Sequence, residues 1–303
     1  MSAGIITRSA HPDALWPGVK AWFGLEYDKV PATWSKIFTK MTSDKYQERI
    51  AEGTTFGLAP SKTEGAPIQY DSDGEGYVAI FQHTVYGLGY IVTREELEDN
   101  QYDEVSRARS ANLAWSMSTT AEFVHANVFN RGFDSAYPIG DGQPLFSASH
   151  PTQGGVQSNL LTGADFSEAA MEDATKHVWR VQNNRGFPIN AGVKRIVINP
   201  EDAFTVTRVL NSVLRSGTNN NDINALNAMG IVPDVVVDKY LTDTNSWYVQ
   251  TDVPNGLISM WRRQVELEKD NDFDTENAKA KATMRFTAGA ADWRSAFGNP
   301  GSS

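Results

Sequence analysis

An α+β fold is predicted for this chain by two patterns of opposite period and by the order in which they occur. Apolar residues recur at helical spacing through one long segment before residue 132, whereas they alternate with a period of two near the end of the chain. Strands and helices do not alternate regularly and no internal repeat is found, which disfavours a doubly wound sheet or a β/α barrel.

Composition limits the size class and the kinds of partner. The 303 residues suffice for two domains or one large domain with excursions, and 40% apolar with 11% aromatic residues can form a real core. With 27 Lys and Arg against 37 Asp and Glu, the net charge of −10 argues against a protein held to nucleic acid by its overall charge. The net charge does not exclude local basic patches on the surface.

Residue types that are missing exclude further classes. Without cysteine, the chain has no disulfide, no thiolate metal site and no cysteine nucleophile. No apolar run is long enough to span a bilayer, and the first residues lack a signal peptide. We therefore expect a soluble product, made in a cytoplasm, from which no leader is removed.

The first forty residues combine aromatic side chains with prolines, so only short helices fit there. Two interpretations stay open. The aromatic side chains pack on the chain's own core, or they form an arm that buries them on a neighbouring subunit, since interfaces favour tryptophan. The large apolar residues of this segment are Trp16, Trp22, Phe23, Trp34, Ile37 and Phe38.

Residues 42–93 are predicted to form a long two-stranded hairpin. Strand-like runs such as 77–82 and 85–92 are separated by glycine-rich turns. The part from Ala59 to Gly76 is polar and rich in Gly and Pro, which suits a mobile end. Because an isolated hairpin is marginally stable in water, this one needs a surface to lie against.

A helix of about 25–35 residues is predicted from Thr93 to about Arg131, because neither Pro nor Gly interrupts the sequence before Gly132. Alternatively it breaks near Asn100. Its apolar stripe consists of Leu113, Met117, Ala121, Val124 and Val128. Acidic residues suit its beginning, where the helix dipole favours negative charge; they are Glu95, Glu96, Glu98, Asp99, Asp103 and Glu104.

After a long loop, the sequence predicts a mixed α/β region. One helix opens at Asp165, with Glu168 as its capping partner. A strand at 194–198 leads into a second helix, in which Asn199 is the cap and Pro200 takes the first position. The buried stripe of the first helix is Met171, Ala174, Val178 and Val181, and the second helix ends near Leu214.

The last hundred residues are predicted to be mostly strand. The strands expected there are 234–240, 246–251, 256–261 and 278–286. The last alternates most regularly, with small apolar residues on one face and Lys279, Lys281 and Arg285 on the other. For this cationic stripe a solvated strand face and an interface with acidic partners stay open as alternatives.

No motif with a catalytic or cofactor-binding mechanism is found. Gly87-Leu88-Gly89 lacks the third glycine of a dinucleotide fingerprint and lies in a strand pattern. The acidic turns at 71–75 and 270–274 depart from the calcium-loop pattern, so solvated turns are expected. Ser147 and Ser149 near His150 hint at a nucleophile and base, but no nucleophile elbow accompanies them and an exposed loop histidine is expected.

The other histidines, His11, His83, His125 and His177, have no spacing at which one helix would present two metal ligands. We therefore predict no catalytic, cofactor-binding or metal-binding residue, and no enzyme. An aromatic arm, a long hairpin, a long helix and a strand-rich end indicate instead a subunit that reaches onto others.

Three stretches carry a resemblance to a known family. They are residues 141–174 with a Leu-Phe-Ser-x-x-His-Pro core, residues 197–210 (VINPEDAFTVTRVL), and residues 284–298 with Asp-Trp-Arg. Together with the element order from Thr42 onward, they resemble the major capsid proteins of tailed bacteriophages, most closely the Mu-type major head subunit family. The first stretch is the most specific, and the order and spacing of the others support it.

The resemblance implies the tailed-phage major capsid fold, of the Hong Kong 97 type. Its long helix would be the spine of a peripheral domain, and residues near Ser216–Asp222 would face the symmetry axes. The implied parts are an N-terminal arm at 1–41, an extended hairpin loop at 42–93, a peripheral domain at 94–186 and 263–303, and an axial domain at 187–262.

The implied function is that of a structural virion protein. Hexamers and pentamers would close into an icosahedral shell around double-stranded DNA, which is not recognised by sequence, after synthesis in the bacterial host cytoplasm. Implied partners are a portal, a possible decoration protein and, because the arm is short, a separate scaffolding protein or none. No membrane, no cofactor and no covalent cross-link through Lys62 are expected.

Three other classes of protein stay open as alternatives to a capsid protein. They are an encapsulin-like cellular shell on the same fold, a phage tail or baseplate subunit, and a soluble enzyme with an unfamiliar site.

Overall fold

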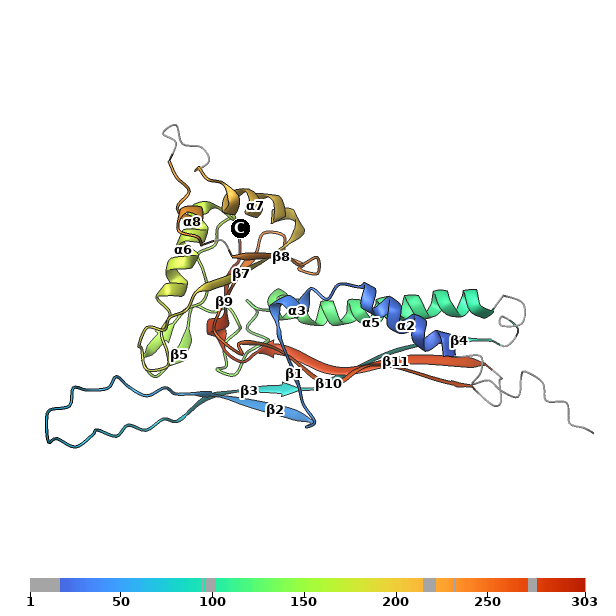
Figure 1. Ribbon diagram of the computed structural model, residues 1–303, viewed down its shortest axis with the longest axis horizontal. Coiled ribbons are helices and arrows are strands. Elements are labelled where there is room, and N and C mark those ends of the chain that lie inside the picture. Colours follow the sequence, from blue (N-terminus) through green and yellow to red (C-terminus); the bar gives the residue numbers. More distant parts are fainter. Residues whose placement is uncertain are drawn as a thin grey trace, which may run out of the picture.

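Figure 1 shows the computed structural model of the chain, which describes residues 17–93, 95, 102–214, 222–231, 233–271 and 277–302. Two bodies and one long hairpin make up the described chain. The first body is an elongated sheet covered by helices, and the second is a smaller sheet with its own helices near one end of the first (Figure 1). This arrangement confirms the predicted α+β class.

The elongated body, here called the spine body, is a four-stranded sheet on which the helix α5 lies. Its strands occur in the order β1-β10-β11-β4, with β1 parallel to β10 and the other pairs antiparallel. The alternation predicted for 278–286 is confirmed, since Ala280, Ala282, Met284 and Phe286 are all buried. The bounds are α2 (Pro17–Lys29), α5 (Tyr102–Asn130), β1 (Thr39–Thr42), β4 (Thr84–Val92), β10 (Leu257–Asn271) and β11 (Ala278–Ala290).

The long helix is confirmed over Tyr102–Asn130, while residues 94 and 96–101 lie outside the described residues. Its predicted apolar stripe faces the core, where Leu113, Met117 and Ala121 are buried and two valines are partly buried. The stripe therefore fixes which face of α5 lies on the sheet.

Residues 17–41, predicted as part of an arm, pack on the chain's own core. The helix α2 lies against α5, and the short helix α3 (Trp34–Ile37) stacks Trp34 on His125 with 4.5 Å between ring centroids. Phe23, Ile37 and Phe38 are buried in the same cluster. These residues therefore pack on the core of their own chain, which is the first of the two interpretations. Trp16 and the side chain of Trp22 lie outside the described residues.

The predicted hairpin is present, but it ends at Gln82 and does not include the strand-like run predicted at 85–92. β2 (Gln47–Gly53) pairs with β3 (Glu75–Gln82), and the irregular residues between them extend beyond both bodies (Figure 1). After His83 the chain enters β4, which pairs with β11 and not with the hairpin. The reason is burial: Tyr86 and Tyr90 of β4 pack against the core of the spine body, which a two-stranded hairpin cannot offer.

The second body is a sheet of order β12-β9-β7-β8 with helices on one side. Its strands are short, as predicted. The strand predicted at 256–261, by contrast, belongs to the spine body as β10 and continues to Asn271, because β11 pairs with it. The bounds are β5 (His150–Thr152), β6 (Gly155–Gln157), α6 (Glu168–Trp179), β7 (Val193–Ile198), η2 (Pro200–Asp202), α7 (Ala203–Asn211), α8 (Ala225–Ala228), β8 (Asp234–Val237), β9 (Trp247–Thr251), η3 (Trp293–Ser295) and β12 (Ala296–Asn299).

The two predicted helix starts in this body have different outcomes. The Asn199 cap is confirmed, because its side chain accepts a 3.1 Å hydrogen bond from the backbone N–H of Glu201. The cap of α6 is Ser167, whose hydroxyl accepts from Ala170 N at 3.2 Å, and not Asp165. Asp165 accepts instead from the hydroxyl of Ser302. Serine and aspartate are equally good caps, so the sequence could not decide between them.

Two ionisable side chains of α5 lie in the core between α3 and the sheet. The carboxylate of Glu122 accepts hydrogen bonds from the backbone N–H of Thr33 at 2.7 Å and of Trp34 at 3.3 Å. Burial, with a smaller contribution from Asp238, raises the pKa of Glu122 to about 7. Glu122 thus holds the start of α3 at the cost of a carboxylate in an apolar site.

The second of these groups is neutral. Burial lowers the pKa of His125 to about 4. Its Nδ1 lies 2.6 Å from the carbonyl oxygen of Ala121 and its Nε2 lies 2.7 Å from Ser259 Oγ. The neutral ring therefore donates from Nδ1 and accepts at Nε2 from the serine hydroxyl.

We predict that Glu122→Gln stabilises the folded chain at alkaline pH. The folded state keeps a proton on Glu122 between its ordinary pKa of 4.5 and about 7, so the free energy of unfolding falls as the pH rises through this window. Glutamine keeps an oxygen for Thr33 and Trp34 but carries no charge. In urea unfolding, the substitution should raise the free energy of unfolding by about 1–3 kcal/mol near pH 8 and change it little near pH 5.

The matched control is Glu64→Gln in the exposed irregular loop, which should leave the free energy of unfolding nearly unchanged at both pH values. An effect of Glu122→Gln that is the same at both pH values would contradict the raised pKa.

Candidate assembly surfaces

Two of the stretches that carry the family resemblance meet in the core. His150 is fully buried, with Nδ1 2.6 Å from Asp141 Oδ2 and Nε2 2.9 Å from Asn159 Oδ1. Its ring stacks on Trp293, with 4.6 Å between centroids and 3° between the planes. The stacked rings of His150 and Trp293 are therefore one of the contacts that join these two motifs.

The amide of Asn159 fixes the orientation of this contact. Its Nδ2 donates to the backbone carbonyls of Leu145, Trp293 and Ala296 at 2.7, 3.1 and 2.9 Å, so its oxygen faces His150. The two ring nitrogens of His150 therefore each face an oxygen atom, one of the Asp141 carboxylate and one of the Asn159 amide. These contacts hold the ring where it stacks on Trp293.

The serines beside His150 do not contact it. Ser147 Oγ lies 3.3 Å from Ser149 Oγ, and Ser149 N–H donates to Ser147 Oγ at 3.1 Å. The expectation of an exposed loop histidine is wrong, because His150 has no exposed surface. The sequence could not reveal this, since the tryptophan that covers the ring lies far along the chain.

Arg294, next to that tryptophan, anchors the base of the hairpin. Its guanidinium lies over the ring of Trp293 at 4.4 Å and forms an ion pair with Glu52 of β2. It also donates to Asn184 Oδ1 at 2.8 Å and to the carbonyl of Gln182 at 2.7 Å. Sequence reasoning used the Asp-Trp-Arg run only as a family motif and did not foresee this role.

A second arginine fastens the irregular residues 54–74, here called the loop segment. Arg185 forms a 2.6 Å ion pair with Asp71 and donates at 2.6 Å to the carbonyl of Ser72. A hydrogen bond from Gly57 N–H and then the Arg185 guanidinium lower the pKa of Asp71. The acidic turn at 71–75 is exposed, as predicted, and its first residue, Asp71, also anchors the loop segment through Arg185.

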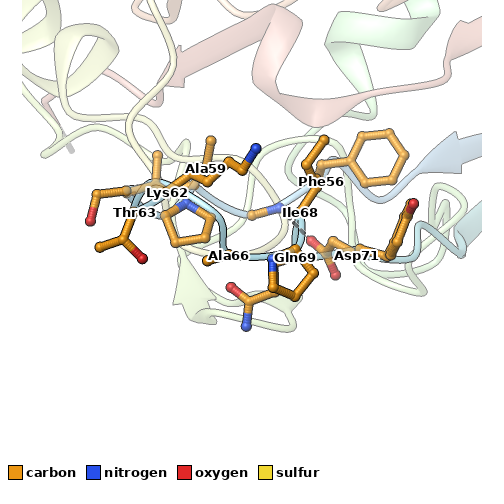
Figure 2. Close-up of a pocket in the computed structure, with 14 residues that line it drawn as sticks. Phe56, Ala59, Lys62, Thr63, Ala66, Ile68, Gln69 and Asp71 are labelled. Atoms are coloured by element: carbon orange, nitrogen blue, oxygen red, sulfur yellow. Dashed lines mark hydrogen bonds between the residues drawn. The ribbon is translucent and has the colours of Figure 1, made fainter.

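The loop segment presents apolar side chains that nothing in the described chain covers. A hollow of about 720 Å³ lies between its two legs, and Figure 2 shows Phe56 and Ile68 among the residues that line it. Exposed apolar side chains that gather in one segment mark an interaction surface. Those of the loop segment are Phe56, Leu58, Ile68 and Tyr70, of which Tyr70 is 93% exposed.

A second apolar surface lies at the end of the second body, next to α7 and α8. It borders residues 215–221, where the polar loop predicted to face the symmetry axes lies outside the described residues except for Asp222. The exposed apolar side chains there are Phe204, Val213, Leu214, Ile223 and Met229.

The cationic stripe of β11 divides into two parts. Lys281 is paired with Glu268 on the neighbouring strand at 2.8 Å, as a solvated face would be. Arg285 forms no ion pair with any described residue, and its guanidinium lies over the ring of Tyr46 at 5.9 Å. The solvated-face alternative thus holds for Lys281, while for Arg285 an interface with an acidic partner stays a prediction.

The remaining sequence candidates lie in structural positions. Gly87 and Gly89 are within β4, where a side chain at Gly89 would approach the carbonyl of Ala280 to 2.8 Å. Asp272 and Asp274, like His11, lie outside the described residues. Among the residues that the structure does describe, no group of His, Asp and Glu is placed to hold a metal ion, and no helix is long and apolar enough to cross a membrane.

Comparison with solved structures places this fold. The mature capsid of bacteriophage PhiM1 is 12% identical, with 89% of this chain and 87% of that chain covered and a TM-score of 0.56. The capsid of the empty GTA particle is 13% identical, with 90% of each chain covered and a TM-score of 0.55. A virus-like particle from Pyrococcus furiosus is 10% identical, with 93% and 97% covered and a TM-score of 0.54.

At these identities the likeness shows the fold alone, which is the predicted tailed-phage capsid fold. No curated protein sequence matches the chain. The sequence model of the family described as phage capsid protein, however, matches residues 77–299, from the third strand to the last. The chain belongs to the phage capsid protein family.

Proposed function

We propose that this chain is the major head subunit of a tailed phage of the Mu type. Hexamers and pentamers of the chain close into an icosahedral shell that encloses double-stranded DNA, and the chain acts there as a structural protein of the virion. Membership of the phage capsid protein family supports the shell. The Mu-type assignment rests on the sequence motifs at 141–174, 197–210 and 284–298.

The observation that carries this proposal is the loop segment. It reaches away from both bodies (Figure 1), exposes apolar side chains, and is held at its base by Arg294 and Arg185. A segment that is fixed at its base and carries exposed apolar side chains along both of its legs is suited to lie on another molecule. In a shell, that molecule is a neighbouring copy.

The parts of the fold take the roles that the resemblance implies. We assign 42–93 to the extended loop, with the qualification that β4 lies in the sheet of the peripheral domain. Residues 94–186 and 263–303 form the peripheral domain, and 187–262 form the axial domain with its apolar end toward the symmetry axes. Residues 1–41 form the arm. Within it, α2 and α3 pack against the spine helix α5 of the same chain.

Partners other than the chain itself follow from the same assignment. A portal, a separate scaffolding protein and a possible decoration protein complete the head, and the host cytoplasm is the place of synthesis. The packaged DNA is held without sequence recognition. The net charge of −10 supports this, since a shell that does not attract DNA leaves it free to be packed.

An encapsulin-like cellular shell is the second candidate. It is favoured by one observation, the likeness to the Pyrococcus furiosus virus-like particle, of which 97% is covered. Protein cargo in place of DNA would distinguish this candidate.

We predict that the purified full chain forms closed icosahedral particles. Sedimentation should show particles far larger than a monomer, whose radius of gyration would be about 19 Å, and negative-stain microscopy should show closed shells. Particles from infected cells should contain nuclease-protected DNA. A stable monomer at high concentration would contradict the proposal, and enzyme cargo without DNA would favour the cellular shell.

The apolar loop surface is predicted to be needed for assembly and not for folding. Replacing Phe56 and Leu58 with Ser removes two side chains that are 60% and 76% exposed, so the free energy of unfolding should change by less than about 0.5 kcal/mol. Assembly should fall at least about tenfold, because each copy loses buried apolar area. The control Val156→Ser, 69% exposed outside the loop segment, should assemble normally, and equal assembly of both variants would refute this role.

Lys62 is predicted to form no covalent cross-link between copies. Intact-mass analysis of denatured particles should therefore give the 33.4 kDa chain alone. Masses at multiples of this value that disappear in a Lys62→Arg variant would contradict the prediction.

A further inference from the structure

Three arginines gather on the face of the spine sheet that points away from α5. They are Arg262 and Arg263 of β10 and Arg285 of β11, here called the arginine cluster. Arg263 and Arg285 are directly opposite each other in the register of the two strands. Like charges in this cross-strand position repel each other, so the sheet alone gains nothing from the arrangement.

Carboxylates of the described chain compensate little of this charge. Arg263 Nε lies 3.8 Å from Glu266, and its Nη2 donates to Thr283 Oγ1 at 3.0 Å. Arg262 is exposed and Arg285 is half-buried, and neither forms an ion pair with any residue that the structure describes. The Nε atoms of Arg263 and Arg285 are buried without a hydrogen-bond partner.

A buried histidine adds two further unpartnered atoms to this site. His83, between β3 and β4, is 5% exposed, and neither ring nitrogen has a hydrogen-bond partner. His83 lies beside Tyr46, to whose carbonyl its N–H donates at 3.5 Å, and the Arg285 guanidinium lies over the ring of that tyrosine. Burial, followed by the charges of Arg285 and Arg262, lowers the pKa of His83. Polar groups buried without partners are costly and rare in folded proteins.

Among the described residues, the carboxylate whose charge acts on His83 is that of Glu48, and it is already engaged. Glu48 accepts a 2.8 Å hydrogen bond from Ser43 and forms a 3.2 Å ion pair with Lys45, and these contacts lower its pKa. Farther along the same sheet face, by contrast, Lys281 is paired with Glu268. The excess of unpaired donors is therefore local to the arginine cluster and His83.

We propose that the arginine cluster and His83 bind carboxylate side chains of a second copy of this chain. The inference rests on the proposed function, in which copies meet, and it adds which surface receives a neighbour. Guanidinium groups with half-buried donors suit the planar, directional hydrogen bonds of a carboxylate. Every copy carries a surplus of carboxylates, as the net charge of −10 shows.

A phosphate backbone is the less suitable anion for this site. DNA is bound through cations spread along an exposed surface, whereas two of the three arginines here are half-buried beside the hairpin base. Recognition of single acidic side chains fits such half-buried donors better, and the acids of a neighbouring copy are such groups.

The test compares assembly of the full chain with Arg262→Glu and Arg285→Glu combined against the wild type. The matched control is Lys279→Glu with Lys281→Glu, which makes the same change of charge on the same face of the same sheet. The assembled fraction of the arginine variant should fall at least about tenfold, because acids would then face acids across the contact, while the control stays close to wild type. Thermal unfolding of the unassembled chains checks that both variants fold.

The possible outcomes separate the alternatives. An arginine variant that assembles like wild type overturns the inference, as does one that assembles normally but loses packaged DNA, which would assign the site to phosphate. If the double variant does not fold, Arg262→Glu alone replaces it, because that side chain is exposed; normal assembly of this variant also overturns the inference.

The assembly state of the wild-type chain tests the proposed function separately. If the wild type forms oligomers that are not closed shells, the proposed shell is contradicted. If the arginine variant then fails to form these oligomers, the carboxylate contact is still supported. A wild type that stays monomeric at high concentration would overturn both. As a further check, Arg262→Lys with Arg285→Lys keeps the charge but loses the planar guanidinium donors, so its assembly should lie between that of the wild type and that of the glutamate variant.

Discussion

The stacking of His150 on Trp293 is the contact on which the position of the extended hairpin depends. It joins two segments that are far apart in the chain, and Asn159 secures the junction by bonding to three backbone carbonyls of both. Arg294 follows that tryptophan directly, so the stack also sets where its guanidinium meets Glu52 of β2. The direction in which the loop leaves the body is thus decided by a buried ring pair and not by the loop itself.

Two neighbouring strands of the second body, β7 and β9, contribute side chains to the cores of both bodies, which makes the bodies a single unit. In β9 all residues are buried, with Trp247 and Val249 facing the helices of the second body and Tyr248 facing the spine body. In β7, Val197 faces the spine body while its neighbours face the helices. Because alternating side chains of one sheet fill both cores, the bodies cannot separate without exposing both. The apolar side chains of the loop segment and those near α7 lie outside both cores.

Charge in this acidic chain is divided between internal anchoring and outward contact. Arg294 and Arg185 form ion pairs that hold the hairpin, and Lys281 forms an ion pair with Glu268 on the next strand. Glu122 is held in the core by backbone donors although burial raises its pKa to about 7. Against this background the unpaired Arg285 and the unpartnered ring of His83 are exceptions, and unpaired buried donors are what an interface, more than a monomer, can satisfy.

The sequence by itself determined the elements whose signals are local: the apolar stripe of α5, the alternation of β11 and the Asn199 cap, because each follows from the spacing of neighbouring residues. Only the tertiary structure decided that β4 leaves the hairpin for β11, that Ser167 and not Asp165 caps α6, and that His150 is buried. It also revealed the anchoring role of Arg294 and the excess of charge around Arg285. These outcomes depend on partners far along the chain, whose distance no local pattern encodes.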